Sequence, residues 1–474
     1  MINDRFELVC GLETHIELAT ATKIFCGCST EFGKAPNENT CPGCLAHPGV
    51  LPKVNKRAVE FAIKAGLATN GEISLESFMD RKNYFYPDLP KAYQVTQMEK
   101  PISIGGFIEL DSGKKIRIHH IHLEEDAGKL VHKGNATFID YNRGGVPLIE
   151  IVTEPGFRTA DEAVEYLEKL QMLMRYIEVS DCKMQEGSMR CDVNTSVRPH
   201  GTDEFGVRSE IKNMNSFAFI KKAIEYEYER KCDLAENKIS EVQETRRYVE
   251  QSGSTESMRT KEDAHDYRYF KDPDLLKMVF TQDYINDIKK SLGELPFNKL
   301  KRYVAGGLSE IDAMNIVRYK KMANFFDSAC KDLPNIKSVS NFLLGAIYSR
   351  LDGEEAKENC EINISPQDLN AIVKLLDDGK INSQIAKKML AEMLDDGKTL
   401  AEIKNKYESN AVNADDLAKF VDQAIAECAK AAEDVRDGKM QAIGAIIGAV
   451  MKKSKGAADA NTARKLILEN LQNS

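Results

Sequence analysis

The chain has 474 residues, of which 42% are apolar and 29% charged, the composition of a soluble globular protein. This length exceeds one ordinary hydrophobic core, so two or three domains are expected. No run of about 18 apolar residues is present and the N-terminus lacks a targeting pattern, so we expect no membrane span and a cytoplasmic location. The net charge of −9 argues against a wholly electrostatic nucleic-acid binder but leaves a local RNA-binding face open.

The first segment with strand character spans residues 6–18, in which apolar and polar residues alternate. Successive side chains of a strand point to opposite faces, so Glu13, His15 and Glu17 share the face opposite the apolar residues. Two carboxylates beside an imidazole can bind a metal ion or transfer protons. From this segment alone, an ordinary exposed face and a metal or acid/base site both remain open.

Four of the eleven cysteines lie together, as two pairs with short internal spacing. One residue separates Cys26 from Cys28, and Pro-Gly separates Cys41 from Cys44. Four thiolates suit the tetrahedral coordination of zinc and leave no open position, which indicates a structural zinc site. The alternative is a chance cluster of reduced cysteines.

Two later strands contain or run into acidic residues. The strand expected at 116–123 continues directly into three acids at 124–126, which repel one another unless a cation or several donors neutralise them. The strand expected at 146–152 is apolar apart from Glu150, and a buried carboxylate needs a partner. A single satisfied structural glutamate is the alternative at that position.

Two further strands alternate in the same way and carry charges of both signs. Their polar faces hold Arg190, Asp192, Asn194 and Ser196 in the strand at 189–197, and Arg208, Glu210 and Lys212 in the strand at 207–212. Together the strands predict a polar concave sheet. Oxygen ligands with one imidazole favour magnesium or manganese, and magnesium usually arrives with nucleotide phosphates. The sequence has no P-loop, no Rossmann glycine motif and no amidase motif, so another chain must release ammonia if an amide donates nitrogen.

The sequence changes character near residue 293, after which helical periodicity dominates. The prediction is an α+β fold with a sheet-containing domain at 1–293, a helical domain at 294–405 and a small helical tail at 406–474. Residues 430–474 contain eight basic and five acidic residues, including Lys452, Lys453 and Lys455. This local excess is compatible with binding an RNA backbone and equally with a solvated helix end.

Seven sequence blocks occur in a specific order within the first 290 residues. They read Gly-Leu-Glu-Thr-His at 11–15, Asp-Arg-Lys-Asn-Tyr-Phe-Tyr-Pro-Asp at 80–88, His-Leu-Glu-Glu-Asp-Ala-Gly-Lys at 122–129, Asn-Arg-Gly-Gly-Val-Pro-Leu-Ile-Glu at 142–150, Glu-Gly-Ser-Met-Arg-Cys-Asp at 186–192, Glu-Ile-Lys-Asn at 210–213 and Asp-Tyr-Arg-Tyr-Phe at 266–270. This ordered set closely resembles the B subunit of the tRNA-dependent amidotransferases. The tail, including 438–456, resembles the small helical tail of the same family.

The resemblance implies a two-step reaction on mischarged tRNA. The B subunit of the family phosphorylates the side-chain carboxylate of Glu-tRNA(Gln) or Asp-tRNA(Asn) with ATP, and ammonia displaces the phosphate to form the amide. The A subunit makes the ammonia from glutamine and the C subunit straps the two together, so a heterotrimeric ligase is expected. The family's first domain is an antiparallel-sheet cradle with helices, and its tail is expected to bind tRNA. ATP, magnesium and a structural zinc ion are the implied cofactors.

Carried over position by position, the resemblance implies roles for several charged residues. The magnesium-binding set is Glu13, His15, Glu125 and Glu150. Nearby candidates for supporting these ligands are Glu124, Asp192 and Glu210. The cations that would neutralise phosphate or position the acyl group are Arg81, Lys82, Arg190 and Lys212. Phosphoryl transfer depends mostly on positioning and electrostatics, which these residue types supply. The block at 266–270 is assigned no role.

Two other classes of protein fit parts of the sequence. A non-catalytic zinc-containing RNA-binding scaffold would turn over no ATP and would bind RNA regardless of Glu13, His15 or Glu150. A self-sufficient ligase acting on a free amino acid would need its own amine route and would work without the A subunit or charged tRNA. The sequence leaves open whether Glu-tRNA(Gln), Asp-tRNA(Asn) or both are substrates.

Overall fold

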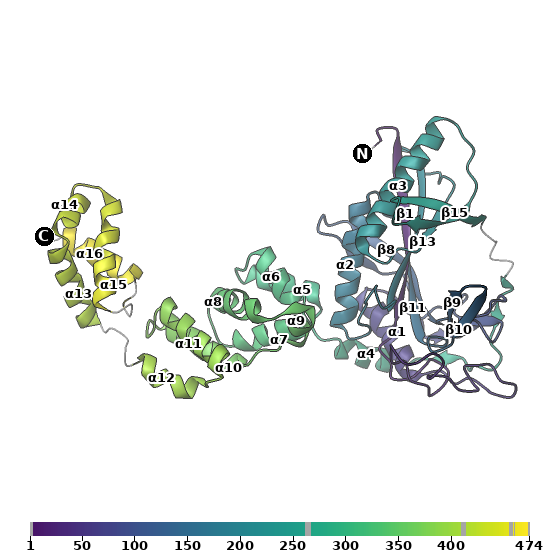
Figure 1. Ribbon diagram of the computed structural model, residues 1–474, viewed down its shortest axis with the longest axis horizontal. Coiled ribbons are helices and arrows are strands. Elements are labelled where there is room, and N and C mark those ends of the chain that lie inside the picture. The colour runs from purple at the N-terminus through teal and green to yellow at the C-terminus, as the bar shows by residue number, and fades with distance from the viewer. Residues whose placement is uncertain (1–2, 261–266, 409–413, 455–457, 459, 473–474) are drawn as a thin grey trace. The chain divides into compact units, whose positions relative to one another are not determined.

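The computed structural model describes residues 3–260, 267–408, 414–454, 458 and 460–472. The chain forms two compact units, Met1–Leu295 and Pro296–Ser474 (Figure 1). The strands all belong to the first unit, and the described part of the second unit is helical, which confirms the predicted α+β class. Within the described residues, no helix is long and apolar enough to cross a membrane.

A ten-stranded sheet forms the centre of the first unit. Its strand order is β15-β14-β13-β12-β1-β11-β8-β6-β2, with β7 paired to β8 outside this path. The strands are β1 (Phe6–Glu17), β2 (Glu72–Ile73), β6 (Ser103–Ile104), β7 (Phe107–Glu109), β8 (Lys115–Glu125), β11 (Pro147–Thr153), β12 (Met189–Pro199), β13 (Ser209–Lys212), β14 (Glu244–Val249) and β15 (Ser254–Thr260). The pairs are antiparallel except β13 with β14, whose parallel pairing depends on a helical crossover between them.

The apolar face of the sheet packs against helices. In β1 the side chains of Leu8, Leu12 and Ile16 are at most 3% exposed, as the alternating pattern predicts. Cys10 forms a backbone bridge with Phe157, whose ring meets Tyr166 edge to face, with centroids 5.3 Å apart. The covering helices are α1 (Lys56–Ala68), α2 (Ala160–Tyr176) and α3 (Phe217–Glu236) (Figure 1). The polar residues of β1 therefore lie on the opposite face.

Smaller elements lie beside the main sheet. They are β3 (Glu76–Ser77) with β17 (Met278–Val279), β16 (Phe270–Lys271) with β4 (Asp80–Asn83) and β5 (Tyr93–Thr96), the hairpin β9 (Lys129–Lys133) and β10 (Ala136–Asp140), and the helix α4 (Gln282–Ser291). The pairing of β4 with β16 brings the block at 80–88 beside the block at 266–270. Asp266, the first residue of the latter block, lies outside the described residues.

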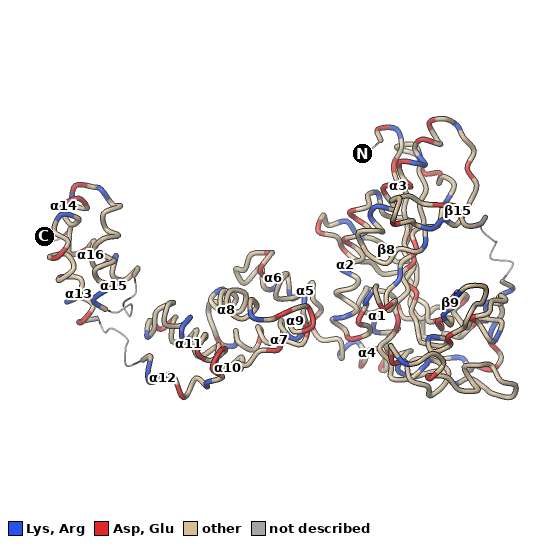
Figure 2. The backbone as a smooth tube through the Cα atoms, in the orientation of Figure 1, with Lys and Arg blue, Asp and Glu red and all other residues tan. Residues whose placement is uncertain are grey.

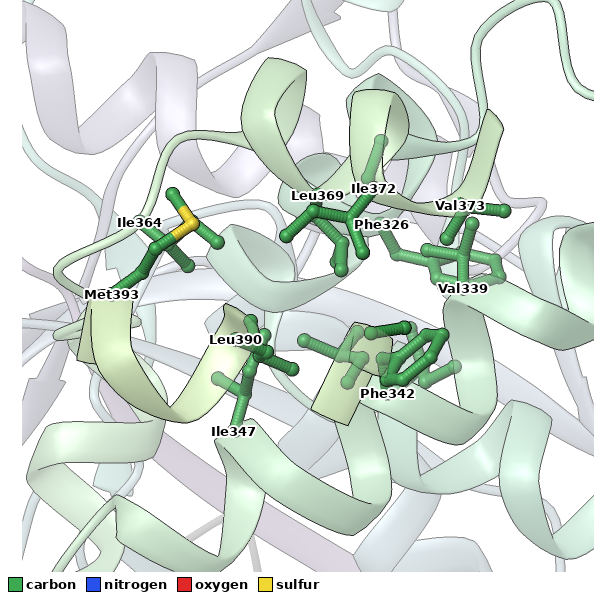
Figure 3. Close-up of a cluster of buried hydrophobic side chains, with 14 of the residues drawn as sticks. Phe326, Val339, Phe342, Ile347, Ile364, Leu369, Ile372, Val373, Leu390 and Met393 are labelled. Carbon is green, nitrogen blue, oxygen red and sulfur yellow. The ribbon is translucent and has the colours of Figure 1, made fainter. Parts of the chain in front are cut away.

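The second unit consists of short helices around two apolar clusters. Its α-helices are α5 (Pro296–Ala305), α6 (Glu310–Val317), α7 (Lys320–Ala329), α8 (Ile336–Phe342), α9 (Gly353–Asn359), α10 (Pro366–Asp377), α11 (Ser383–Asp396), α12 (Leu400–Glu408), α13 (Ala414–Glu427), α14 (Ala429–Arg436), α15 (Ile443–Lys453) and α16 (Ala460–Gln472). A π-helix, Leu343–Ile347, extends α8. One cluster, part of which is drawn in Figure 3, includes Phe326, Leu369 and Leu390, and the other lies between Leu417 and Leu471. The division of this unit into two domains near residue 405 stays a prediction.

Charges of both signs are interspersed along both units (Figure 2). In α15 the Nζ atom of Lys453 lies 2.6 Å from Oε1 of Glu427, and Lys452 is exposed. Lys455, the third lysine of the predicted basic tail, lies outside the described residues. One of these lysines is therefore already paired within the chain, whereas Lys452 faces solvent.

Candidate functional site

The polar face of the sheet brings several predicted site residues into one row. In β1, His15 lies opposite Glu150 of β11 and opposite Arg190 of β12. Glu150 in turn lies opposite His122 of β8. Four neighbouring strands thus present two imidazoles, one carboxylate and one guanidinium side by side. This arrangement depends on the register of strands that are up to 175 residues apart in sequence.

The centre of this row is an imidazole–carboxylate cluster, which consists of His15, His122, Glu124 and Glu150. Nε2 of His15 lies 3.4 Å from Glu150 and 3.5 Å from Glu124, and Nε2 of His122 lies 3.2 Å and 3.6 Å from the same two carboxylates. Ligand atoms of His15, Glu124 and Glu150 all lie within 4.8 Å of one another. The cluster therefore has the residue types and the spacing of a site for a hard divalent cation.

The pKa shifts of the cluster residues are those expected for closely spaced imidazole–carboxylate pairs. Burial by itself would lower the pKa of His15, but Glu150 and Glu124 outweigh it and raise that pKa to about 9. Burial would also lower the pKa of His122, but the same two carboxylates outweigh it and raise that pKa to about 10. Burial would raise the pKa of Glu150, yet the two imidazoles hold it well below its usual range. The two carboxylates therefore favour the protonated form of both imidazoles.

A third histidine, His120, lies next to the cluster because it is two residues before His122 on the same face of β8. The register of β8 shifts opposite Val152 and Thr153, and Nε2 of His120 lies 3.1 Å from Nδ1 of His122. The two rings stack with centroids 5.1 Å apart. Burial and then the neighbouring His122 and His119 lower the pKa of His120 to about 4. Burial and the neighbouring histidines therefore favour the neutral form of His120.

The next row of the same face holds an acid–lysine cluster, which consists of Glu13, Asp192, Glu210 and Lys212. Glu13 lies opposite Asp192, and ligand atoms of the three acids lie within 4.8 Å of one another. Nζ of Lys212 donates to Asp192 and lies 3.1 Å from Oε1 of Glu210. Burial disfavours the charged lysine, but the two carboxylates raise the pKa of Lys212 above its usual value. The cluster is therefore neutralised in part by its own ammonium group.

Glu125 does not join either cluster. Both oxygens of its carboxylate accept hydrogen bonds from Nζ of Lys91, at 2.5 and 2.6 Å, and one also accepts from the backbone of Val95 at 2.8 Å. Along β8, Glu125 shares its face with Leu123, while Glu124 shares the polar face with His122, because side chains alternate. The structure thus places Glu124, instead of the expected Glu125, beside His15 and Glu150.

Arg190 belongs to the row of His15 and is tied to the acidic end of β8. Its Nη2 donates to Oδ2 of Asp126 at 2.6 Å, and its Nε is buried without a hydrogen-bond partner within the described residues. Burial disfavours the charged guanidinium, but Asp126 raises the pKa of Arg190. Burial and then Asp126 raise the pKa of Glu17, on the next row, to about 8. Arg190 is thus a fixed cation with an unused donor at the site.

Arg81 and Lys82 lie on β4, where Lys82 pairs with Gln94 of β5, and Nε2 of Gln94 donates to Oε2 of Glu124 at 3.1 Å. The guanidinium of Arg81 donates to Asp272 at 2.8 Å and to Asp274 at 2.7 Å. Nζ of Lys82 lies 4.8 Å from the centroid of the Tyr267 ring, a cation–π contact. Arg81 therefore ties β4 to the segment after β16, which is a structural use of a residue predicted to bind the cofactor.

The four clustered cysteines converge in space. All four Sγ atoms lie within 4.8 Å of one another, and those of Cys41 and Cys44 are 3.9 Å apart. A tetrahedral zinc ion with Zn–S bonds of about 2.3 Å would separate its sulfur ligands by about 3.8 Å. None of these cysteines forms a disulfide. Cys26, Cys28, Cys41 and Cys44 thus fit a structural zinc ion.

His122 was not assigned a role from the sequence, although it contacts both carboxylates of the first cluster. The signal was present in the residue pattern, because His120, His122 and Glu124 alternate along one strand just as Glu13, His15 and Glu17 do. The pattern could not show which strand would pair with this one. In the structure it is β11, on which Glu150 lies opposite His122.

Comparison with known families assigns the first unit to a class of enzymes. A family model described as the GatB/GatE catalytic domain matches residues 8–286, and a second, described as the GatB domain, matches residues 324–471. Both clusters lie within the first match. The family match therefore identifies one component of a ligase that forms carbon–nitrogen bonds with glutamine as the amide donor.

Relatives are similar over nearly the whole chain. The B subunit of the aspartyl/glutamyl-tRNA(Asn/Gln) amidotransferase of Thermoanaerobacter sp. (strain X514) is 48% identical over 473 residues, which cover 98% of this chain and 99% of the relative. The corresponding subunits of Caldicellulosiruptor bescii and Clostridium botulinum (strain Hall) are also 48% identical, over 98% of this chain and 99% and 98% of their own lengths. The chain belongs to the family of amidotransferase B subunits, as its ordered sequence blocks predict.

Proposed function

We propose that the chain activates the side-chain carboxylate of the amino acid on Glu-tRNA(Gln), Asp-tRNA(Asn) or both. The γ-phosphate of ATP is transferred to a carboxylate oxygen, which gives an acyl phosphate and ADP. Ammonia then attacks the carbonyl carbon and phosphate leaves, which gives the amide. The observation that carries this proposal is the sheet face on which the imidazole–carboxylate cluster lies one row from the acid–lysine cluster. Phosphoryl transfer needs a cation site beside groups that hold anionic reactants, and this face supplies both.

His15, Glu124 and Glu150 are the residues that would hold magnesium. Their convergence within 4.8 Å supports this set, and carboxylate oxygens with one imidazole suit a hard cation. When bound, the ion would neutralise charge on the phosphates. Compared with the set expected from the resemblance, Glu124 replaces Glu125, and Glu13 belongs to the neighbouring row.

Lys212 and Arg190 would orient the anionic reactants on the same face. The carboxylates around Lys212 keep its ammonium protonated at neutral pH and fix its position. The carboxylate of Asp126 fixes the guanidinium of Arg190 while its Nε has no acceptor within the described residues. Fixed cations stabilise developing phosphate charge without reorganisation at the moment of reaction. Asp192 and Glu210 act through Lys212 as positioning residues.

The nitrogen and the tRNA come from partners. We assign glutamine hydrolysis to the A subunit, and the C subunit joins the other two. We assign tRNA backbone contact to the helical tail, where Lys452 is exposed and a cation near phosphates adds affinity that decreases with salt. A zinc ion on the four cysteines would be structural, because four thiolates leave no position for a substrate.

The test reconstitutes the chain with its glutaminase and small partner subunits and supplies glutamine, ATP, magnesium and mischarged tRNA. His15→Ala and Glu150→Ala are expected to lose amide formation while glutamine hydrolysis by the glutaminase partner remains detectable. Glu76→Gln changes a glutamate on the surface that pairs with Lys277, and it is expected to retain wild-type activity. Undiminished activity in both alanine variants would move the activation site elsewhere. Absence of amide formation by the folded and assembled wild type would favour the scaffold hypothesis.

A further inference from the structure

The polar face of the sheet continues beyond the acid–lysine cluster onto β14. This strand pairs in parallel with β13, and in that register Glu210 lies opposite Thr245 and Lys212 lies opposite Arg247. Residues that lie opposite each other in neighbouring strands point to the same face, so Thr245 lies beside Glu210 on the polar face. Thr245 is 2% exposed, and the proposed reaction has so far given it no role.

The hydroxyl of Thr245 binds one oxygen of a buried carboxylate. Oγ1 of Thr245 donates to Oε2 of Glu210 at 3.0 Å, while Nζ of Lys212 lies 3.1 Å from Oε1 of the same carboxylate. A carboxylate whose two oxygens bind different donors cannot rotate without losing one of these hydrogen bonds. Thr245 therefore fixes which oxygen of Glu210 faces Lys212.

A buried ion-pair network on the other face of the sheet holds β14 in place. Arg246 points away from Thr245, because successive side chains of a strand alternate, and its Nε lies 3.0 Å from Oε1 of Glu227 on α3. Glu227 is fully buried. Its carboxylate also accepts hydrogen bonds from Thr255 of β15 and, at 2.8 Å, from Arg230 of α3. The backbone that carries Thr245 is therefore tied to both α3 and β15, so its hydroxyl has a fixed position.

The position of the Lys212 ammonium depends on the carboxylates that hold it. Its Nζ donates to Asp192 and lies beside Glu210. The lysine stem of four carbons is flexible, so the directions of these two carboxylates decide where the charge lies. Without the Thr245 hydroxyl, Oε2 of Glu210 would compete for the ammonium and draw it toward β14. A fixed cation stabilises developing phosphate charge without reorganisation, whereas a displaced one must first move back.

We propose that Thr245 is a positioning residue for Lys212: its hydroxyl orients the Glu210 carboxylate, which holds the ammonium where the anionic reactants bind. Thr245 acts through Glu210 and touches no reactant itself. This inference rests on the proposed function, because that function is what places phosphate groups beside Lys212. The rival explanation is that the Thr245 hydroxyl only stabilises the fold, and the experiment distinguishes the two.

The experiment measures the affinity of the assembled three-subunit complex for inorganic tripolyphosphate in the presence of magnesium, together with the Tm of each variant. Lys212→Met removes the ammonium and is expected to raise the Kd at least about tenfold. Thr245→Val removes the hydroxyl but keeps the branched shape, and it is expected to raise the Kd about tenfold, the effect of one hydrogen bond to a charged group. Thr245→Ser keeps the hydroxyl and is expected to restore the wild-type Kd.

A double variant and a matched control separate positioning from a general effect on the fold. In the Lys212→Met background, Thr245→Val is expected to change the Kd no further, because the two residues act in one chain of contacts. The matched control is Thr195→Val on β12. Thr195 is 1% exposed, and its hydroxyl has no hydrogen-bond partner within the described residues. This variant makes the same chemical change in the same sheet and is expected to bind tripolyphosphate as the wild type does.

Each other outcome overturns a stated part of the argument. A Kd that Lys212→Met raises and Thr245→Val leaves unchanged would overturn the inference and leave the proposed function intact. An equal effect of Thr245→Val in the wild-type and Lys212→Met backgrounds, or no restoration by Thr245→Ser, would assign the effect to packing and would also overturn the inference. A Kd that Lys212→Met leaves unchanged, or a wild-type complex that does not bind tripolyphosphate, would overturn the inference together with the role proposed for Lys212.

Discussion

The two units of this protein treat buried charge in opposite ways. The sheet of the first unit buries His122, Glu124, Glu125, Asp126 and Glu210, each at most 8% exposed. Among the described residues of the second unit, Lys299 is the buried charged residue, and both clusters consist of apolar side chains. Burying a charge destabilises a fold unless the charge is paired. The first unit thus holds paired buried charges, both at the two clusters and elsewhere, whereas the second unit is stabilised mainly by apolar packing.

Removal of the proposed zinc ion tests the segment of the first unit that holds the four clustered cysteines. Cys44→Ser is expected to lose nearly all bound zinc, because three thiolates remain, and to increase hydrogen exchange in residues 22–55. The binding free energy of a structural zinc ion is about 10–16 kcal/mol, so this is the largest effect expected. Metal content and exchange are measured by mass spectrometry. Cys428→Ser in the second unit is the control, and one zinc per chain retained in Cys44→Ser would contradict the assignment.

A large-to-small change in the second unit tests its dependence on packing. Phe326, which is labelled in Figure 3, belongs to the larger apolar cluster of the second unit. Its side chain is 1% exposed, and its ring meets that of Tyr303 edge to face, with centroids 4.9 Å apart. Phe326→Ala is expected to lower the free energy of unfolding of the second unit by about 3–5 kcal/mol through the lost contacts and the cavity. The unfolding transition of the first unit is expected to stay unchanged in calorimetry. Equal destabilisation of both transitions would show that the units do not unfold independently.

A pair of neighbouring glutamates tests which carboxylate belongs to the magnesium site. Glu124→Gln is expected to raise the magnesium concentration for half-maximal amide formation at least about tenfold, because a ligand charge is lost. Glu125→Gln removes the partner of Lys91 and is expected to change activity or stability without this shift in magnesium dependence. Magnesium titrations of both variants in the assembled complex provide the measurement. A shift in Glu125→Gln alone would restore the set expected from the sequence.

The ion pair of the buried Lys299 with Asp327 is expected to make the stability of the second unit modestly dependent on pH. Asp327 accepts hydrogen bonds from Lys299, from Arg302 at 3.0 Å and from Tyr303 at 2.9 Å. Burial opposes these partners, but they hold the pKa of Asp327 below its usual value. A lowered folded-state pKa stabilises the fold above the unfolded-state value, about 3.9, and this contribution disappears as the pH falls through the folded-state value.

Asp327→Asn is therefore expected to lower the stability of the second unit by about 1 kcal/mol at pH 7. Its difference from the wild type is expected to shrink below about pH 4. Urea denaturation at a series of pH values measures both quantities. A difference that is independent of pH would assign the effect to packing instead of charge.

Local patterns predicted the elements of the fold well because alternation is a property of a single strand. The strands expected at 6–18, 146–152 and 189–197 correspond to β1, β11 and β12, and the helical periodicity expected after residue 293 corresponds to the helices of the second unit. The four cysteines are also predicted from spacing alone, since their turns are short and local. The pairing of β13 with β14 is parallel, which the strand patterns did not indicate, because it depends on α3 between them.

The sequence by itself determined which residues share a face, which cysteines can chelate one ion and, through its ordered blocks, which family the chain belongs to. Only the tertiary structure decided that Glu124 and His122 meet His15 and Glu150, and that Glu125 binds Lys91 instead. It also decided that Arg81 forms an ion pair with Asp272, which is 191 residues away in sequence. The physical reason is that side-chain alternation follows from the backbone of one strand, whereas register and ion pairing follow from contacts between segments distant in sequence.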